Sequence, residues 1–120
     1  MLSPFGKALR KLRIDRGWRL KDMADGIDVS ASYLSAVETG RKSISSDLVS
    51  KIEKWAKLTA DECSDLARSA AISAKEFKFA LPKNATDADR EAVAFLARTF
   101  EEGDREVLKQ VRELVERRRA

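Results

Sequence analysis

Apolar residues recur at intervals of three and four along most of this chain, in short blocks that open with Ser, Thr or Asp. Such spacing puts apolar side chains on one face of an α-helix, and these three residue types are good N-caps. Glycines follow several blocks, at the position where helices commonly end. The pattern predicts a mainly all-α chain, with helices over about 4–16, 18–27, 31–39, 46–56, 60–70, 87–102 and from 105 onward.

The residue types exclude several classes of chemistry. The chain has 120 residues, of which 43% are apolar, enough for a packed core in one domain or two small ones. It has no histidine, which removes Ser-His-Asp triads and most zinc sites, and Cys63 lacks a histidine that could activate it. We therefore expect a protein that is not an enzyme and that uses no metal or cofactor.

The sequence also predicts a compartment. A single cysteine rules out an internal disulfide, which is typical of a reducing environment. No run of 18 apolar residues occurs, and the first residues lack the apolar segment of a signal peptide. We expect a cytoplasmic protein with no membrane partner.

Positive charge is concentrated in the first half of the chain. Residues 1–58 hold 12 basic and 7 acidic residues, a net charge of +5, whereas residues 59–120 hold 12 and 13, a net charge of −1. A basic segment favours a polyanionic partner, although an ordinary solvated surface would carry the same charge.

Two of the predicted helices, over 18–27 and 31–39, are separated by a very short turn. Asp28 in this turn tolerates the left-handed conformation, and Ser30 can cap the helix that follows. In a helix-turn-helix the second helix enters the DNA major groove. The outward residues of the second helix are Ala, Ser and Thr, so its backbone can approach the bases closely. Ser can hydrogen-bond to base edges and Ala can contact a thymine methyl.

The segment LRKLRIDRGWRLKDMADGIDVSASYLSAVETGRKSIS resembles the Xre/Cro-type, lambda-repressor-like helix-turn-helix DNA-binding family. The resemblance covers about residues 5–58 and is carried by the ordered set Ser-x-Ser-Tyr-Leu-Ser-x-Val-Glu-x-Gly-Arg after the turn. It implies a five-helix DNA-binding domain over residues 1–72. Asp28 stands where the family usually has Gly, and Leu20 stands where many members have Gln, a frequent backbone or base contact.

The resemblance implies roles for matching positions. It implies that Arg13 and Glu38 form an internal ion pair, and that Tyr33 contacts a phosphate or a base; packing of Tyr33 against the first helix is the alternative. Ser30 corresponds to an N-cap near a phosphate. The implied base-facing residues are Ala31, Ser32, Ser35 and Ala36, and the implied phosphate contacts are Arg19, Lys21, Arg41 and Lys42.

Residues 73–120 form a second region, which we expect to serve dimerisation or partner binding. Apolar and other residues alternate over 76–81, which predicts a short strand, or an extended segment lying across the helices. A lone strand needs a partner, and the same strand of a second chain is the simplest one. The two amphipathic helices that follow either form a dimer interface or fold back onto the first domain. The final arginines suit a helix C-terminus better than a second nucleic-acid patch.

The favoured function is a sequence-specific transcriptional regulator, a repressor that binds double-stranded operator DNA as a homodimer. The alternative is an antitoxin-like or phage-type regulator whose C-terminal half binds a partner protein, either a toxin or a peptidase. Both functions imply a bacterial or phage-encoded protein of the cytoplasm that is associated with the nucleoid.

Overall fold

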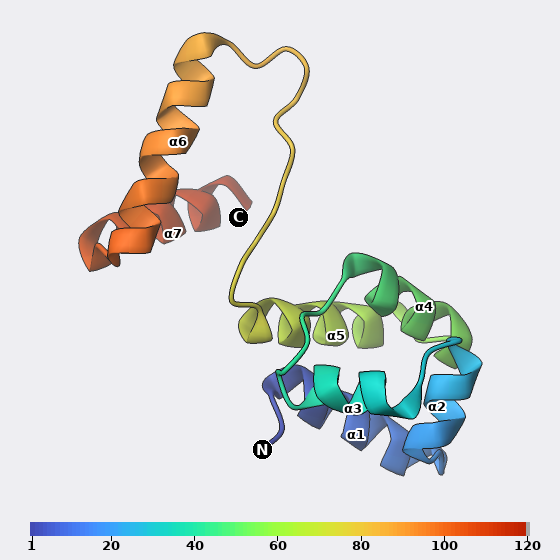
Figure 1. Cartoon of the computed structure of the whole chain (residues 1–120). Coiled ribbons are helices and arrows are strands. Elements are labelled where there is room, and N and C mark those ends of the chain that lie inside the picture. The colour runs from blue at the N-terminus through green and yellow to red at the C-terminus, as the bar shows by residue number, and fades with distance from the viewer. Residues whose placement is uncertain (120) are drawn as a thin grey trace. The chain divides into compact units, whose positions relative to one another are not determined.

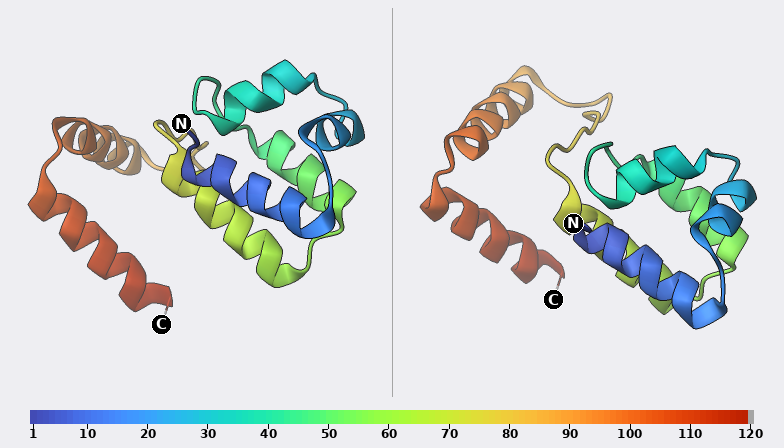
Figure 2. Two further views of the ribbon diagram at one scale, coloured as in Figure 1. Left: turned by 90° about the horizontal axis from the view of Figure 1, so that it is seen from below. Right: turned by 60° about the horizontal axis from the view of Figure 1, so that its bottom comes forward.

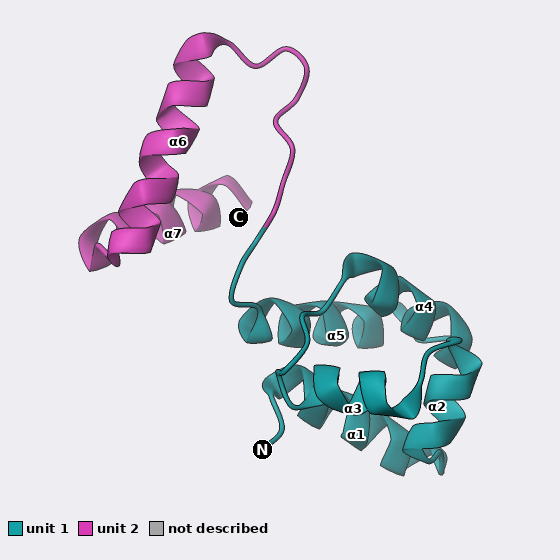
Figure 3. Ribbon diagram, in the orientation of Figure 1, with its two compact units in different colours: residues 1–77 teal, residues 78–120 magenta. Residues whose placement is uncertain are grey.

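The computed structural model describes residues 1–119, and Ala120 lies outside the described residues. The described chain is all-helical (Figure 1) and forms two compact units, residues 1–77 and 78–120 (Figure 3). The division of function between residues 1–72 and 73–120 stays a prediction. The helices are α1 (Pro4–Arg16), α2 (Leu20–Gly26), α3 (Ala31–Glu38), α4 (Ser46–Ala56), α5 (Ala60–Ser73), α6 (Asp87–Glu102) and α7 (Arg105–Arg119).

Unit 1 contains α1 to α5 around one apolar core. Helix α1 packs along α5 and also contacts α2 and α3, and α4 closes the core against α5 (Figure 2). The fully buried side chains come from α1, α2, α3 and α4, and Leu66 of α5 belongs to the same core. The largest of them are Phe5, Leu9, Met23, Leu34, Val37 and Ile52.

Local signals in the sequence account for where these helices begin and end. Ser30 Oγ accepts a hydrogen bond from the backbone N–H of Tyr33 at 3.0 Å, which caps α3. Ser45 Oγ caps α4 in the same way, through the N–H of Leu48 at 3.0 Å. Asp28 adopts a φ of 58°, the left-handed conformation that reverses the chain between α2 and α3.

Helix α5 extends to Ser73, three residues beyond the predicted end at Ala70. Ser73 Oγ accepts a hydrogen bond from the backbone N–H of Phe5 at 2.9 Å. This N–H lies in the first turn of α1 and has no acceptor within its own helix. The last turn of α5 is therefore tied to the start of α1 by a contact between residues distant in the sequence.

Unit 2 contains α6 and α7, joined at Gly103. Gly103 has a φ of 73°, and Asp104 Oδ1 caps α7 by accepting from the N–H of Val107 at 3.1 Å. No residue of α6 or of the described part of α7 is buried. Several of their apolar side chains are partly covered and others are exposed; the exposed ones are Phe95, Phe100, Leu114 and Val115.

The strand predicted over residues 76–81 is wrong. No strand is present among residues 1–119, and this segment has no regular secondary structure. Phe77 and Phe79 are 70% and 73% exposed. A strand needs backbone hydrogen bonds to a neighbouring strand, and the described chain offers none. The alternation marks an extended segment, but alternation alone does not supply the partner.

Candidate DNA-binding surface

Helices α2 and α3 pack against each other through their apolar faces and turn their polar faces outward. Met23 and Ala24 of α2 and Leu34 and Val37 of α3 are all fully buried. The chain reverses sharply at Asp28 between them. Helix α2 is thus fixed against α3, and α3 exposes one side to solvent.

The exposed side of α3 forms a shallow surface hollow, which we term the α3 hollow. Ala31 and Ser32 are exposed, and Ser35 and Ala36 are half-buried on its floor. The side chains of α3 that line it are all small, so the backbone of α3 lies close to the surface. No acidic residue lines it. The lining residues are Ala31, Ser32, Ser35, Ala36, Arg41 and Lys42, and all six belong to the set implied by the resemblance.

The two cations of the α3 hollow are held by the turn that ends α3. Gly40 has a φ of 81°, and this turn directs the next two backbone N–H groups toward Ala36 O. Arg41 N donates to that oxygen at 2.8 Å and Lys42 N at 3.1 Å. Both side chains are exposed. Two positive charges therefore lie at the rim of a hollow floored by small residues.

Ser30 and Tyr33 do not line the α3 hollow. Ser30 is exposed, and its hydroxyl is used as the cap of α3. Tyr33 is half-buried and packs against the core of unit 1. The contact of Tyr33 with a phosphate or a base stays a prediction.

Arg19 and Lys21 lie at the start of α2, outside the α3 hollow. Both are exposed. Asp22 accepts from the backbone N–H of Arg19 at 2.8 Å, and the Arg19 guanidinium lies 3.4 Å from the same carboxylate. These two hydrogen bonds, the backbone one above all, lower the pKa of Asp22. The ion pair with Asp22 thus orients Arg19. Because this pair is exposed and weak, a phosphate could replace Asp22 as the partner of the guanidinium.

Arg13 and Glu38 form a buried ion pair. They are 7% and 4% exposed, and the guanidinium donates to both carboxylate oxygens, through Nη1 to Oε2 and through Nη2 to Oε1 at 3.1 Å. The carboxylate is therefore directed into the domain and away from the α3 hollow. Ser3 adds a backbone anchor, because its N–H and hydroxyl donate to Glu38 O at 2.9 and 3.0 Å.

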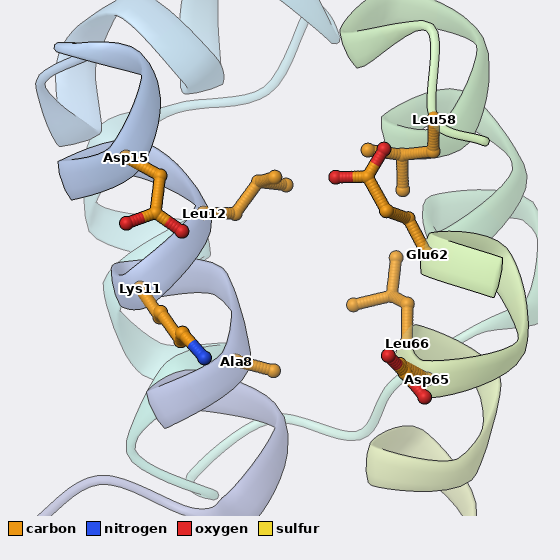
Figure 4. A pocket seen from close by; sticks show the side chains of 8 residues that line it. All are labelled: Ala8, Lys11, Leu12, Asp15, Leu58, Glu62, Asp65 and Leu66. Atoms are coloured by element: carbon orange, nitrogen blue, oxygen red, sulfur yellow. The ribbon is translucent and has the colours of Figure 1, made fainter.

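A second hollow, between α1 and α5, has the opposite charge. Its floor is apolar, with Leu12 and Leu66 facing each other across it (Figure 4). Its rim carries three carboxylates and one ammonium group, and one of the carboxylates, Glu62, is paired with Arg16 at 2.9 Å. Unit 1 thus separates an acidic hollow from a basic one. The charged lining residues are Lys11, Asp15, Glu62 and Asp65.

A third hollow adjoins the α3 hollow and shares Arg41 and Lys42 with it; we term it the adjoining hollow. It lies between the loop after α3 and the residues that follow α5, and Lys75 is among its lining residues. No local pattern groups Lys75 with Arg41, since more than 30 residues separate them in the sequence. The start of α1 links these segments, because Ser3 N donates to Glu38 O at the end of α3 and Phe5 N donates to Ser73 Oγ at the end of α5.

Cys63 lines none of the three hollows. It is half-buried on α5, and a hydrogen bond to Glu53 together with burial raises its pKa. The thiol is therefore un-ionised at neutral pH and a poor nucleophile. No helix among residues 1–119 combines the length and the apolar character that crossing a membrane requires.

A short helix, a left-handed turn and a Ser-capped helix with small outward residues define a helix-turn-helix domain. The family model described as Helix-turn-helix matches residues 9–55. The chain thus carries a helix-turn-helix domain of the Xre/lambda-repressor-like family.

Three known proteins are similar to this domain. Two are the transcriptional regulator ClgR from two strains of Mycobacterium tuberculosis, each 45% identical over 47 residues, or 39% of this chain and 42% of the relative. The chain therefore spans less than half the length of these curated relatives. The third is the crystal structure of the clp gene regulator ClgR from C. glutamicum, which is 35% identical with a TM-score of 0.49. That match covers 57% of this chain and 86% of the other.

Proposed function

We propose that the protein is a sequence-specific DNA-binding transcriptional regulator and that α3 enters the major groove. The observation that carries the proposal is the difference in charge between two hollows: the α3 hollow has two cations and no carboxylate, whereas the hollow between α1 and α5 has three carboxylates and one lysine. A polyanion is attracted to the first and repelled by the second. The similarity to proteins named transcriptional regulators supports the same function.

The way in which DNA would be read follows from the side chains of the α3 hollow. The four α3 residues are Ala and Ser, without Arg, Gln or Asn, the side chains that make paired hydrogen bonds to bases. Affinity then rests on phosphate contacts from Arg41, Lys42, Arg19 and Lys21. Specificity rests on close fit, ordered water and the deformability of the DNA.

We further propose that the protein binds its operator as a homodimer and represses by occluding a promoter. A single helix-turn-helix reads one half-site, and two half-sites lie about 34–36 Å apart. Residues 73–120 offer the dimer interface, because α6 and α7 expose apolar faces and bury none of their residues. Their charges are also complementary: α6 has a net charge of −3, from 2 basic and 5 acidic residues, and α7 has +3, from 6 and 3.

The proposal is tested by fluorescence anisotropy of the full chain with the DNA upstream of its own gene and with a scrambled duplex, each at two salt concentrations. We expect tighter binding to the native fragment, with a steep loss of affinity as salt rises. Ser35→Leu should abolish the preference, because its larger side chain fills the floor of the α3 hollow. Ser64→Leu makes the same change on the exposed face of α5 and should bind as the parent does. If Ser35→Leu binds as tightly as the parent, the placement of α3 in the groove is wrong.

The alternative, an antitoxin-like or phage-type regulator, is favoured by the exposed phenylalanines. Phe77, Phe79 and Phe95 are each at least 70% exposed, which suits capture of a toxin or peptidase partner. Sedimentation of the full chain separates the two proposals. A dimer that Leu114→Glu dissociates, while Lys109→Gln on the polar face of α7 leaves it intact, supports self-association. A monomer at high concentration supports a partner protein. Either function would be exercised in a bacterial or phage-infected cytoplasm, at the nucleoid.

A further inference from the structure

The adjoining hollow extends the basic surface of unit 1 beyond α3. It takes Arg41 and Lys42 from the loop after α3 and Lys75 from the residues after α5. The C-terminal ends of α3 and α5 lie at the same end of unit 1 (Figure 1). Arg41 and Lys42 line both hollows, and Lys75 adds a third cation to the lining of the adjoining hollow; we term these three residues the basic strip.

Two hydrogen bonds to the start of α1 hold this strip together. Ser3 N donates to Glu38 O at 2.9 Å, which fixes the end of α3. Phe5 N donates to Ser73 Oγ at 2.9 Å, which fixes the end of α5. Lys75 lies two residues after Ser73, the last residue of α5, which this hydrogen bond anchors to α1. The backbone that carries the third cation therefore begins at the anchored end of α5.

The charges of the adjoining hollow favour an anion. Its lining includes three cations and one carboxylate, Glu76, and Ser43 adds a hydroxyl donor. Within residues 1–119, Arg41, Lys42 and Lys75 form no ion pair, so their charges are not neutralised by the protein. All three side chains are exposed and can reach a ligand at the surface.

We infer that Lys75 binds a DNA backbone phosphate next to the phosphates bound by Arg41 and Lys42. This inference rests on the proposed function. It adds a contact outside the helix-turn-helix segment and extends the footprint of each half-site toward the flanking DNA. Glu76 opposes the contact, because its carboxylate repels the same phosphate. A phosphate contact carries no sequence information, so Lys75 strengthens binding to every duplex alike.

The test is the salt dependence of DNA binding by the full chain, measured by anisotropy with the native fragment and the scrambled duplex. Loss of one phosphate contact lowers the slope of log K against log salt by about 0.9. When salt rises from 50 to 200 mM, the affinity of both proteins for DNA should fall. The factor of this fall should be about three times smaller for Lys75→Ala than for the parent. Glu76→Gln should bind more tightly than the parent to both duplexes.

Lys83→Ala is the matched control, because it removes one lysine from the same connecting segment outside the adjoining hollow. It should keep the slope of the parent. A parental slope for Lys75→Ala, or an equal loss in both variants, overturns the inference while leaving the proposed function intact. Failure of the parent to bind either duplex in a salt-dependent way overturns the proposed function and the inference with it. Tryptophan fluorescence of each variant checks that unit 1 is folded.

Discussion

Replacing Glu38 by Gln tests the buried ion pair that supports α3. The substitution keeps the size of the side chain but removes its charge, and it leaves the bonds of Ser3 to the Glu38 backbone oxygen in place. Arg13 remains charged, since its guanidinium does not lose its proton in proteins, yet it is only 7% exposed. Removing one partner of a buried pair costs about 3–5 kcal/mol. We expect about 3 kcal/mol, because the Gln oxygen still accepts one hydrogen bond.

Urea unfolding followed by tryptophan fluorescence measures this loss. Trp18 and Trp55 both lie in unit 1, with ring centroids 4.4 Å apart, so the signal reports on that unit alone. With a slope near 1 kcal/mol per molar urea, the midpoint should fall by about 3 M. Glu62→Gln makes the same chemical change in the half-exposed pair with Arg16 and should shift the midpoint much less.

A loss below about 1 kcal/mol for Glu38→Gln would refute the reasoning, because a desolvated guanidinium without its partner cannot be that inexpensive. The double variant Arg13→Met with Glu38→Leu separates structure from recognition. It should be about as stable as the parent, since apolar side chains avoid the cost of desolvating both charges. It should also bind DNA, because the Glu38 carboxylate is directed away from the α3 hollow. Parental stability with lost DNA binding would contradict a purely structural role.

Three further perturbations follow from local geometry. A Cβ at Gly6 would lie 2.1 Å from Glu38 O, so Gly6→Ala should cost about 3 kcal/mol in the same urea assay; an unchanged midpoint would mean that α1 does not approach α3 this closely. Lys57 ends α4 with a φ of 53°, so Lys57→Gly should stabilise unit 1 by about 1 kcal/mol, and a destabilisation would contradict the left-handed cap. The backbone N–H of Thr59 lowers the pKa of Glu62, so its stabilisation is present above the ordinary glutamate pKa of about 4.3 and is lost as pH falls below it. Glu62→Gln should therefore reduce the acid sensitivity of the urea midpoint, and equal sensitivity in both proteins would exclude Glu62 as a cause.

The helices and the residues of the α3 hollow were predictable because their signals are local. Ser30 caps α3 through a residue three positions away, and Asp28 makes its turn by its own tolerance of positive φ. The outward position of the small residues of α3 follows from the helical period alone, once Leu34 and Val37 are placed in the core. Each of these features depends only on a few neighbouring residues, so it can be predicted directly from the sequence.

Contacts between distant residues account for what was missed. Helix α5 was predicted to end at Ala70, since nothing nearby marks Ser73 as its last residue; the bond from Phe5, 68 positions away, does so. Lys75 joins the basic strip for the same reason. The error over residues 76–81 has the opposite origin: alternation described the local backbone conformation, whereas a strand is defined by a partner that the described chain does not contain.

The two units differ in how many of their apolar side chains they bury within themselves. Every buried apolar residue of the described chain lies between Phe5 and Leu66, so the core of unit 1 is closed by its own side chains. Helices α6 and α7 have equally clear caps and periods, yet no residue of α6 or of the described part of α7 is fully buried. Under the proposed dimer, the apolar faces of α6 and α7 would be covered by association with a second chain. Changes on those faces should alter self-association and the affinity for paired half-sites, while the contacts of α3 with a single half-site stay as they are.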